Sequence, residues 1–246
     1  MATASQANTY EIFIETIKKW LADLGVNSTL FVEITKDETL PMTVRTLAAG
    51  VLQYLQLPTD LIPNKYQFIG LIDDVIVMIV GLIIIAPLMP KERLNYYGQK
   101  YEAIDKVEEY KQIMTSTLGI LWEHIVQFVE TLRKHTFKDK TTEEVVQSPE
   151  LSEALFDETM VFVANLDLDP ESLDSDIKQL PAPEKVIGLL SSGLEEAQKQ
   201  QVKDEDSASQ TKSAFKRMLL SATDRQESLP PAGRSRKKTI LKKLNF

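Results

Sequence analysis

Residues 75–86 have the sequence VIVMIVGLIIIA, a run without any charged side chain, and Asp73 and Asp74 precede it. Because this run is apolar on every side, it is typical of a helix that is buried on all its faces. A helix that spans a bilayer needs about 20 apolar residues. A spanning helix here would therefore include the two aspartates, whose charges are costly near the bilayer centre. We favour a buried helix, and a membrane-inserted helix remains the alternative.

Helical periodicity extends along most of the chain on both sides of this run. Apolar residues at helical spacing predict an amphipathic helix at about 9–25, with Gly25 as its stop. Residues 28–34 fit either a short strand or another helical turn. A long helix is predicted from 91 to about 138, with a break near Gly98 or Gly119 as an alternative. Further helices are predicted at 41–57, 70–86, 149–164, 170–180 and 183–201.

These patterns predict an all-α fold, a helical hairpin or bundle around a central apolar helix, with a disordered basic C-terminal tail. Inside the predicted long helix, six apolar residues follow heptad spacing, which indicates a packing seam. The seam is shorter than three heptads, so we favour a helix of the same chain as its partner over a coiled-coil dimer. Its residues are Met114, Leu118, Leu121, Ile125, Phe128 and Leu132.

Charge is distributed unevenly over the 246 residues, which contain 28 Lys and Arg against 36 Asp and Glu. Residues 203–246 carry 11 basic and 5 acidic side chains, a net charge of +6, which leaves −14 for residues 1–202. We expect a helical core at 1–140, an acidic helical extension at 141–202 and the disordered basic tail at 203–246. The acidic body should repel anionic lipid and nucleic acid, whereas the tail should attract either.

The composition excludes several kinds of catalytic site. The chain has no cysteine, which removes disulfides, thiolate zinc sites and cysteine nucleophiles. Its two histidines, His124 and His135, are too far apart for a two-histidine zinc motif on one helix. The acidic string at 167–176 lacks the glycine and the glutamate of a calcium-binding EF-hand. We therefore expect no cofactor and lean against an enzyme, and the N-terminus does not resemble a secretory signal.

One motif is specific enough to suggest a family. Residues 54–63 have the sequence YLQLPTDLIP, followed by Gly70, by the Asp73–Asp74 pair and by the apolar run. This order resembles the signature of the YkvA-like family, whose members carry a domain of unknown function. The resemblance covers about 41–90. It departs from the signature at Asn64, where a third loop aspartate is usual, and at Tyr66 or Gln67, where a proline is common.

The resemblance implies a link to membranes, because the same domain occurs at the membrane end of some RING-type ubiquitin ligases of the endoplasmic reticulum. It implies no established activity. We interpret the motif as structural, with the first-turn aspartates of the apolar helix favoured by the helix dipole and Leu61 and Ile62 filling the core. The motif residues are Pro58, Asp60, Pro63, Gly70, Asp73 and Asp74.

A sharper hypothesis assigns chemistry to the same motif. Asp60, Asp73 and Asp74 could together bind a divalent cation, because hard cations prefer clustered carboxylates. The missing third loop aspartate weakens this hypothesis. A general acid–base pair is weaker still, because no nucleophile or histidine is visible nearby.

The tail offers a second candidate contact surface. Six basic residues are interleaved with apolar ones and no acid follows Glu227, a pattern that suits an anionic membrane interface or a partner groove. Nucleic acid is disfavoured as a partner, because aromatic stacking residues are scarce in this segment. The basic residues are Arg234, Arg236, Lys237, Lys238, Lys242 and Lys243.

Three functions follow from these patterns. The leading hypothesis is a non-enzymatic helical protein on the cytoplasmic side of a membrane, peripheral or partly inserted, that binds membrane lipid, a membrane protein or another protein partner. The alternative is a soluble cytoplasmic scaffold or adaptor whose tail docks a partner. The third, from a different class, is a cation-dependent enzyme that uses the loop aspartates.

Overall fold

A computed structural model describes residues 4–57, 61–62, 70–166 and 184–200, and every structural statement below refers to these residues. Their regular secondary structure is helical apart from one short hairpin, which confirms the predicted all-α class. The chain divides into two units, Met1–Ala197 and Gln198–Phe246, and the fold below is that of the first. The predicted helix at 170–180 and the predicted disorder at 203–246 lie outside the described residues.

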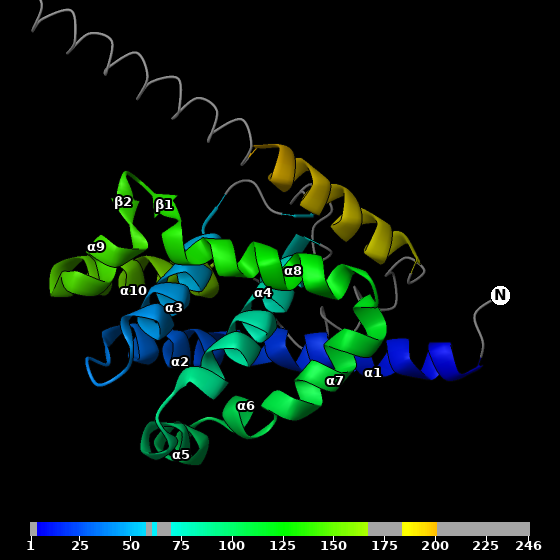
Figure 1. Ribbon diagram of the computed structural model, residues 1–246, viewed down its shortest axis with the longest axis horizontal. Helices are drawn as coiled ribbons and strands as arrows, with labels where there is room; N and C mark the ends of the chain where they lie inside the picture. Colours follow the sequence, from blue (N-terminus) through cyan, green and yellow to red (C-terminus); the bar gives the residue numbers. More distant parts are fainter. Residues whose placement is uncertain (1–3, 58–60, 63–69, 167–183, 201–246) are drawn as a thin grey trace, which may run out of the picture. The chain divides into compact units, whose positions relative to one another are not determined.

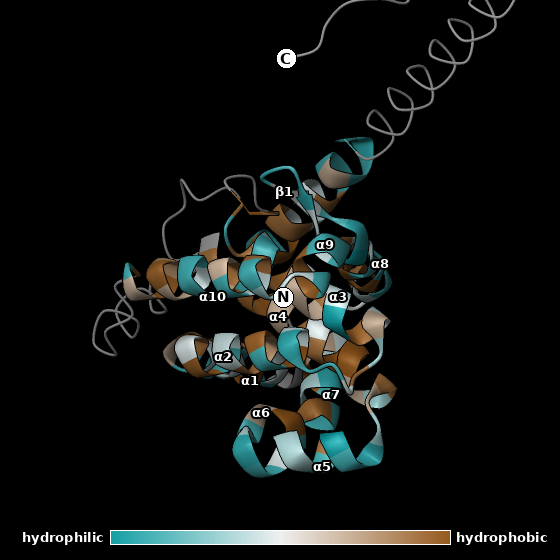
Figure 2. Ribbon diagram, turned by 90° about the vertical axis from the view of Figure 1, so that its left-hand side faces the viewer, coloured by the Kyte–Doolittle hydropathy of each residue, from teal (hydrophilic) through white to brown (hydrophobic). Residues whose placement is uncertain are grey.

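The predicted central helix is present as α4 (Gly70–Ile85), and it packs against α1 (Ala4–Ala22), α3 (Met42–Tyr54), α7 (Val107–Leu118) and α8 (Leu121–Thr131) (Figure 1). All of residues 72–83 are buried. Figure 2 shows hydrophobic ribbon gathered on the helices around α4, whereas α5 (Lys91–Lys100) is mostly hydrophilic. A helix that is apolar on all faces is thus covered on all faces by its own chain.

Its surroundings bear directly on the choice between core helix and membrane helix. Among the described helices, one window, Leu71–Leu88, is long and apolar enough to cross a membrane, and 78% of it is buried inside the protein. The core helix of a water-soluble protein has the same length and composition. The window is therefore weak evidence for a membrane span.

The N-terminal region differs from the prediction at Gly25. Helix α1 ends at Ala22, and α2 (Leu24–Lys36) begins two residues later, so Gly25 lies inside a helix and residues 28–34 are helical. The amide of Asn27 donates to the carbonyl of Asp23, which continues the helical hydrogen bonding across the junction. Glycine ends a helix when its φ is positive, and among the described glycines that conformation occurs at Gly119. The predicted stop at Gly25 was wrong.

The predicted long helix at 91–138 is also wrong, because the chain breaks there several times. One break, at Tyr101, has extended backbone angles of φ −130° and ψ 111° and carries a buried side chain, and another falls at Gly119, with φ 54°. Gly119 was an expected break, whereas Gly98 lies within α5. The elements after α4 are η2 (Ala86–Leu88), α5, α6 (Glu102–Asp105), α7, α8 and η3 (Leu132–Lys134).

The heptad seam continues across the break at Gly119, because its residues fall on α7, on α8 and, for Leu132, at the start of η3. Both helices contact α4, and Met114, Leu118 and Ile125 are buried. The seam therefore packs inside the chain, as favoured over a coiled-coil dimer.

The last described elements follow a short hairpin. Strands β1 (Thr136–Phe137) and β2 (Lys140–Thr141) pair in antiparallel fashion around Lys138 and Asp139, whose φ values are both positive, as a primed turn requires. Helix α9 (Thr142–Gln147) follows, and α10 (Pro149–Ala164) confirms the predicted cap, since Ser148 accepts a hydrogen bond from the Leu151 amide. A final helix covers 184–200, close to the prediction.

Candidate functional site

The ends of α3 and α4 bring two side chains of the family-like motif together in the core. Tyr54 is the last residue of α3 and is 1% exposed, and Asp73 lies in the first turn of α4 and is 0% exposed. The Tyr54 hydroxyl donates to Asp73 Oδ2 over 2.7 Å. A carboxylate withdrawn from water needs such donors, because burying an unpaired charge is very unfavourable.

The same pair holds the segment between the two helices. The Leu61 amide donates to the Tyr54 hydroxyl over 3.0 Å, and the Ile62 amide donates to Asp73 Oδ2 over 3.1 Å. Both side chains of this segment are buried, which confirms that Leu61 and Ile62 fill the core. The Asp73 carboxylate lies in the first turn of α4, and its hydrogen bonds reach outside that helix. It connects the start of α4 with the end of α3 and with the Leu61–Ile62 segment. We call Tyr54, Asp73, Leu61 and Ile62 the core tyrosine–aspartate cluster.

The electrostatics of this cluster keep the tyrosine protonated. Burial raises the pKa of the Tyr54 hydroxyl well above its usual range, and the nearby charges of Asp73 and Asp74 raise it further. Asp74 is itself buried. The hydroxyl therefore remains a hydrogen-bond donor to Asp73 at any ordinary pH. This arrangement suits fixing a loop better than transferring a proton.

The predicted cation site can be compared with the structure only in part. Asp60 lies outside the described residues, as do Pro58 and Pro63, whereas Gly70 begins α4. Within the described part of the chain, no group of three or more acidic or histidine side chains could hold a metal ion. The site formed by Asp60, Asp73 and Asp74 stays a prediction. The basic tail residues from Arg234 to Lys243 also lie outside the described residues.

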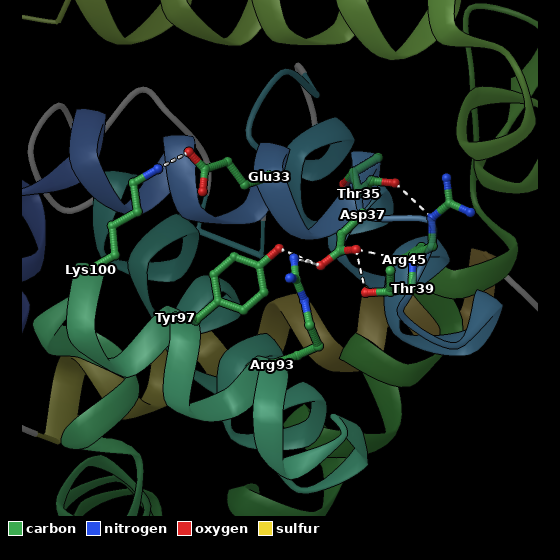
Figure 3. Close-up of polar contacts among 8 residues, drawn as sticks. All are labelled: Glu33, Thr35, Asp37, Thr39, Arg45, Arg93, Tyr97 and Lys100. Atoms are coloured by element: carbon green, nitrogen blue, oxygen red, sulfur yellow. Dashed lines mark hydrogen bonds and ion pairs between the residues drawn. The ribbon is translucent and has the colours of Figure 1, made fainter.

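A second tyrosine–aspartate cluster lies at the edge of the bundle, and the sequence analysis missed it (Figure 3). Asp37 follows α2, and its side chain is 7% exposed. Its Oδ2 accepts a hydrogen bond from the Tyr97 hydroxyl over 3.0 Å and forms an ion pair with Arg93, both on α5. Its Oδ1 accepts bonds from the Thr39 amide and hydroxyl. We call these four residues the edge tyrosine–aspartate cluster.

Hydrogen bonds set the charge state of Asp37. Burial by itself would raise the pKa of this carboxyl, but bonds from Thr39, Arg93 and Tyr97 outweigh it and lower the pKa. Figure 3 shows that Lys100 on α5 also pairs with Glu33 on α2, which fastens the two helices at a second point. The bonds from Thr39 to Asp37 form a local Asx turn, which neighbouring residues alone can suggest. The pairing with Arg93 has no such local signal, because the two residues are far apart in the chain.

A cavity of about 260 Å³ lies between α1, α2, the end of α5, α6 and α7. Lys19 at its edge pairs with Asp23 and Glu102, so charges of opposite sign are matched there. Its lining contains no histidine, serine or cysteine that could act as a nucleophile or a base. The full lining is Lys19, Trp20, Asp23, Val26, Asn27, Lys100, Tyr101, Glu102, Ala103 and Tyr110.

The fold and the core cluster define an all-α protein in which a loop between two helices is fixed by a buried tyrosine–aspartate pair. Residues 44–80 match a family model described as "Protein of unknown function (DUF1232)", which is the YkvA-like family. The resemblance found in the sequence is thus confirmed for this segment, which contains the core tyrosine–aspartate cluster. No curated protein and no solved structure matches the chain.

Proposed function

We propose that this protein is a non-enzymatic binding protein that attaches peripherally to the cytoplasmic face of a membrane through its basic C-terminal segment. The observation that carries the proposal is the combination of a buried apolar helix with a basic, apolar-interleaved tail. Helix α4 stays within the helical bundle, and the tail supplies the attachment.

The burial of α4 favours peripheral attachment over insertion. Helix α4 packs against four helices of its own chain, and all of residues 72–83 are buried. Insertion into lipid would separate α4 from these neighbours and would place Asp73 and Asp74 near hydrocarbon, where charges are costly. Insertion would gain little free energy from the hydrophobic effect, because the side chains of α4 are already removed from water.

The charge distribution supports the tail as the contact. Residues 1–202 carry a net charge of −14 and residues 203–246 carry +6, so attraction to anionic lipid is confined to the tail. Each Lys or Arg near an anionic surface contributes about 1 kcal/mol. Ile240, Leu241, Leu244 and Phe246 supply apolar contacts among these charges.

Flotation with liposomes tests the proposal in the full chain. Wild-type protein should float with vesicles containing phosphatidylserine, and a variant with Lys237→Glu, Lys238→Glu, Lys242→Glu and Lys243→Glu should remain in the aqueous layer. The matched control replaces the same four lysines by arginine, which keeps the charge, and should float like the wild type. Equal flotation of the glutamate and arginine variants would contradict the proposal, as would retention of the wild type on vesicles at 1 M salt.

A soluble scaffold or adaptor is the second candidate, favoured by the apolar residues between the basic ones, since they also suit a groove on a partner protein. In that case, the wild type would stay in the aqueous layer at every salt concentration. The cation-dependent enzyme stays a third, weaker possibility. Calorimetric titration with magnesium, manganese and calcium tests it, and absence of heat with all three would remove it.

A further inference from the structure

The helix at 184–200, coloured gold in Figure 1, is attached to the bundle by one narrow face. Its buried side chains are Val186, Leu190 and Leu194, spaced four residues apart, and its other residues are exposed or half-buried, with Ile187, Leu189 and Ala197 also packed against the core. By contrast, α3 buries ten of its 13 residues, nine of them consecutive. A helix held by few buried apolar contacts belongs to the part of a protein that opens most easily.

The central contact of this helix is with the backbone of the family segment. A Cβ atom added to Gly193 would lie 1.9 Å from the Leu61 carbonyl oxygen and 2.6 Å from the carbonyl carbon. The glycine backbone therefore lies directly against Leu61, at a distance that excludes any other residue. At the start of this helix, Glu184 lies near Tyr10 of α1. Burial raises the pKa of the Tyr10 hydroxyl to about 12, and the charge of Glu184 adds to this effect.

The core cluster determines which side of this peptide faces the helix. In a trans peptide, the C=O and the following N–H point in opposite directions, and the described chain contains no cis peptide. Because the Ile62 N–H points to Asp73, the Leu61 C=O points away from Asp73, toward the position that Gly193 occupies. One peptide unit is thus held from inside by the 44–80 segment and covered from outside by a helix that the family model does not include.

We propose that the surface around Leu61 is a helix-docking site of the family segment, and that helix 184–200 is its intramolecular ligand, able to detach as a unit while α1–α10 remain folded. The site selects an amphipathic helix with aliphatic side chains four residues apart and a glycine opposite Leu61. In this chain, its own residues 184–200 meet these requirements. The proposal does not depend on membrane attachment.

Two glycines of the same helix provide a matched pair of variants for the full-length protein. Gly193→Ala places a methyl group on the Leu61 backbone, whereas a Cβ at Gly188 meets nothing within 4 Å. Both changes raise helix propensity equally, so they differ only in the clash. Hydrogen exchange should be at least tenfold faster over 184–200 in Gly193→Ala than in Gly188→Ala, with α3 and α4 unchanged.

Leu190→Ser is a second way to detach the helix, because it removes the central buried side chain and leaves Gly193 unchanged. It should also accelerate hydrogen exchange over 184–200 and leave α3 and α4 unchanged. Equal exchange over 184–200 in Gly193→Ala and Gly188→Ala would overturn the proposal. So would faster exchange throughout α3 and α4 in Gly193→Ala and Leu190→Ser, because the helix would then be an inseparable part of the core.

Binding in trans tests the docking site itself. A fluorescent peptide of residues 184–200 should bind full-length Gly193→Ala protein, whose own helix no longer fits, and should bind the Gly188→Ala protein at least tenfold more weakly. The same peptide carrying Gly193→Ala should not bind either protein. Failure of the unmodified peptide to bind the Gly193→Ala protein, or equal binding of the two peptides, would overturn the proposal.

Discussion

The core and edge clusters use the same two side chains in different surroundings. In the core, Tyr54 donates to Asp73 over 2.7 Å, and at the edge, Tyr97 donates to Asp37 over 3.0 Å. Asp73 is completely buried and also binds the Ile62 amide, whereas Asp37 is slightly exposed and also binds Arg93. The core cluster fixes a loop of the family segment, and the edge cluster fastens α5 to the end of α2.

The comparison shows that the surroundings of a tyrosine–aspartate pair decide how much the pair contributes to the free energy of unfolding. At the edge, Thr39 is exposed and Arg93 is partly exposed, so water can replace their bonds to Asp37, although Tyr97 is as buried as Tyr54. In the core, a donor that loses its acceptor stays buried, and the full desolvation cost remains. The same mutation should therefore have different effects at the two sites. Two experiments test this difference, and a third tests the charge of the edge cluster.

The largest effect is expected for loss of the carboxylate. Asp73→Ala leaves the Tyr54 hydroxyl and the Ile62 amide without this acceptor and should lower the free energy of unfolding by about 3–5 kcal/mol. Asp37→Ala should lower it by about 1–2 kcal/mol, because water reaches Arg93 and Thr39, two of its three partners. Urea unfolding followed by circular dichroism measures both. Equal losses would show that burial does not set the difference.

A smaller effect is expected when the hydroxyl alone is removed. Tyr54→Phe keeps the ring but removes the atom that connects Asp73 with the Leu61 amide, and should cost about 2–3 kcal/mol. Tyr97→Phe should cost about 0.5–1 kcal/mol, because Thr39 and Arg93 still bind Asp37. Thermal unfolding of the two variants side by side provides the measurement, and a larger loss for Tyr97→Phe would reverse the ranking of the clusters.

The smallest effect is a dependence on pH at the edge cluster. The folded-state pKa of Asp37 is lowered, so as the pH falls the unfolded chain takes up the proton first. The stabilisation is complete above the unfolded pKa of about 4 and is lost as the pH falls through the folded pKa. Wild type should therefore be more stable than Asp37→Asn at pH 6, and the difference should shrink toward pH 2.5. A difference that is constant over this range would contradict the assigned pKa shift.

Local signals in the sequence predicted several elements correctly. The uncharged run from Val75 gave α4 with its start at Gly70, because a helix without a polar face must be buried. Ser148 and Pro149 gave the start of α10, because capping depends on neighbouring residues alone. The order of prolines, aspartates and glycine from Pro58 to Asp74 identified the family segment, and the structure joins Tyr54, Leu61, Ile62 and Asp73 of this segment in one cluster.

Other features could not be found from local signals. The break considered near Gly98 falls three residues later, at Tyr101, where a buried ring packs beside Tyr97. The partners of Asp37 on α5 come from a distant part of the chain. The role of Gly193 has no local signal, because its contact with Leu61 depends on how the last helix lies on the bundle.

The sequence by itself determined the helical class, the central position of α4 and the family segment, because these follow from hydrophobic spacing, caps and a motif that are all local. Only the tertiary structure decided that α4 is enclosed by its own chain and that Asp73 is held in the core and Asp37 at the edge. It also decided that Gly193 of the last helix lies against Leu61. These outcomes depend on contacts between residues far apart in the chain. Such contacts form only when whole helices pack, and no short stretch of sequence encodes them.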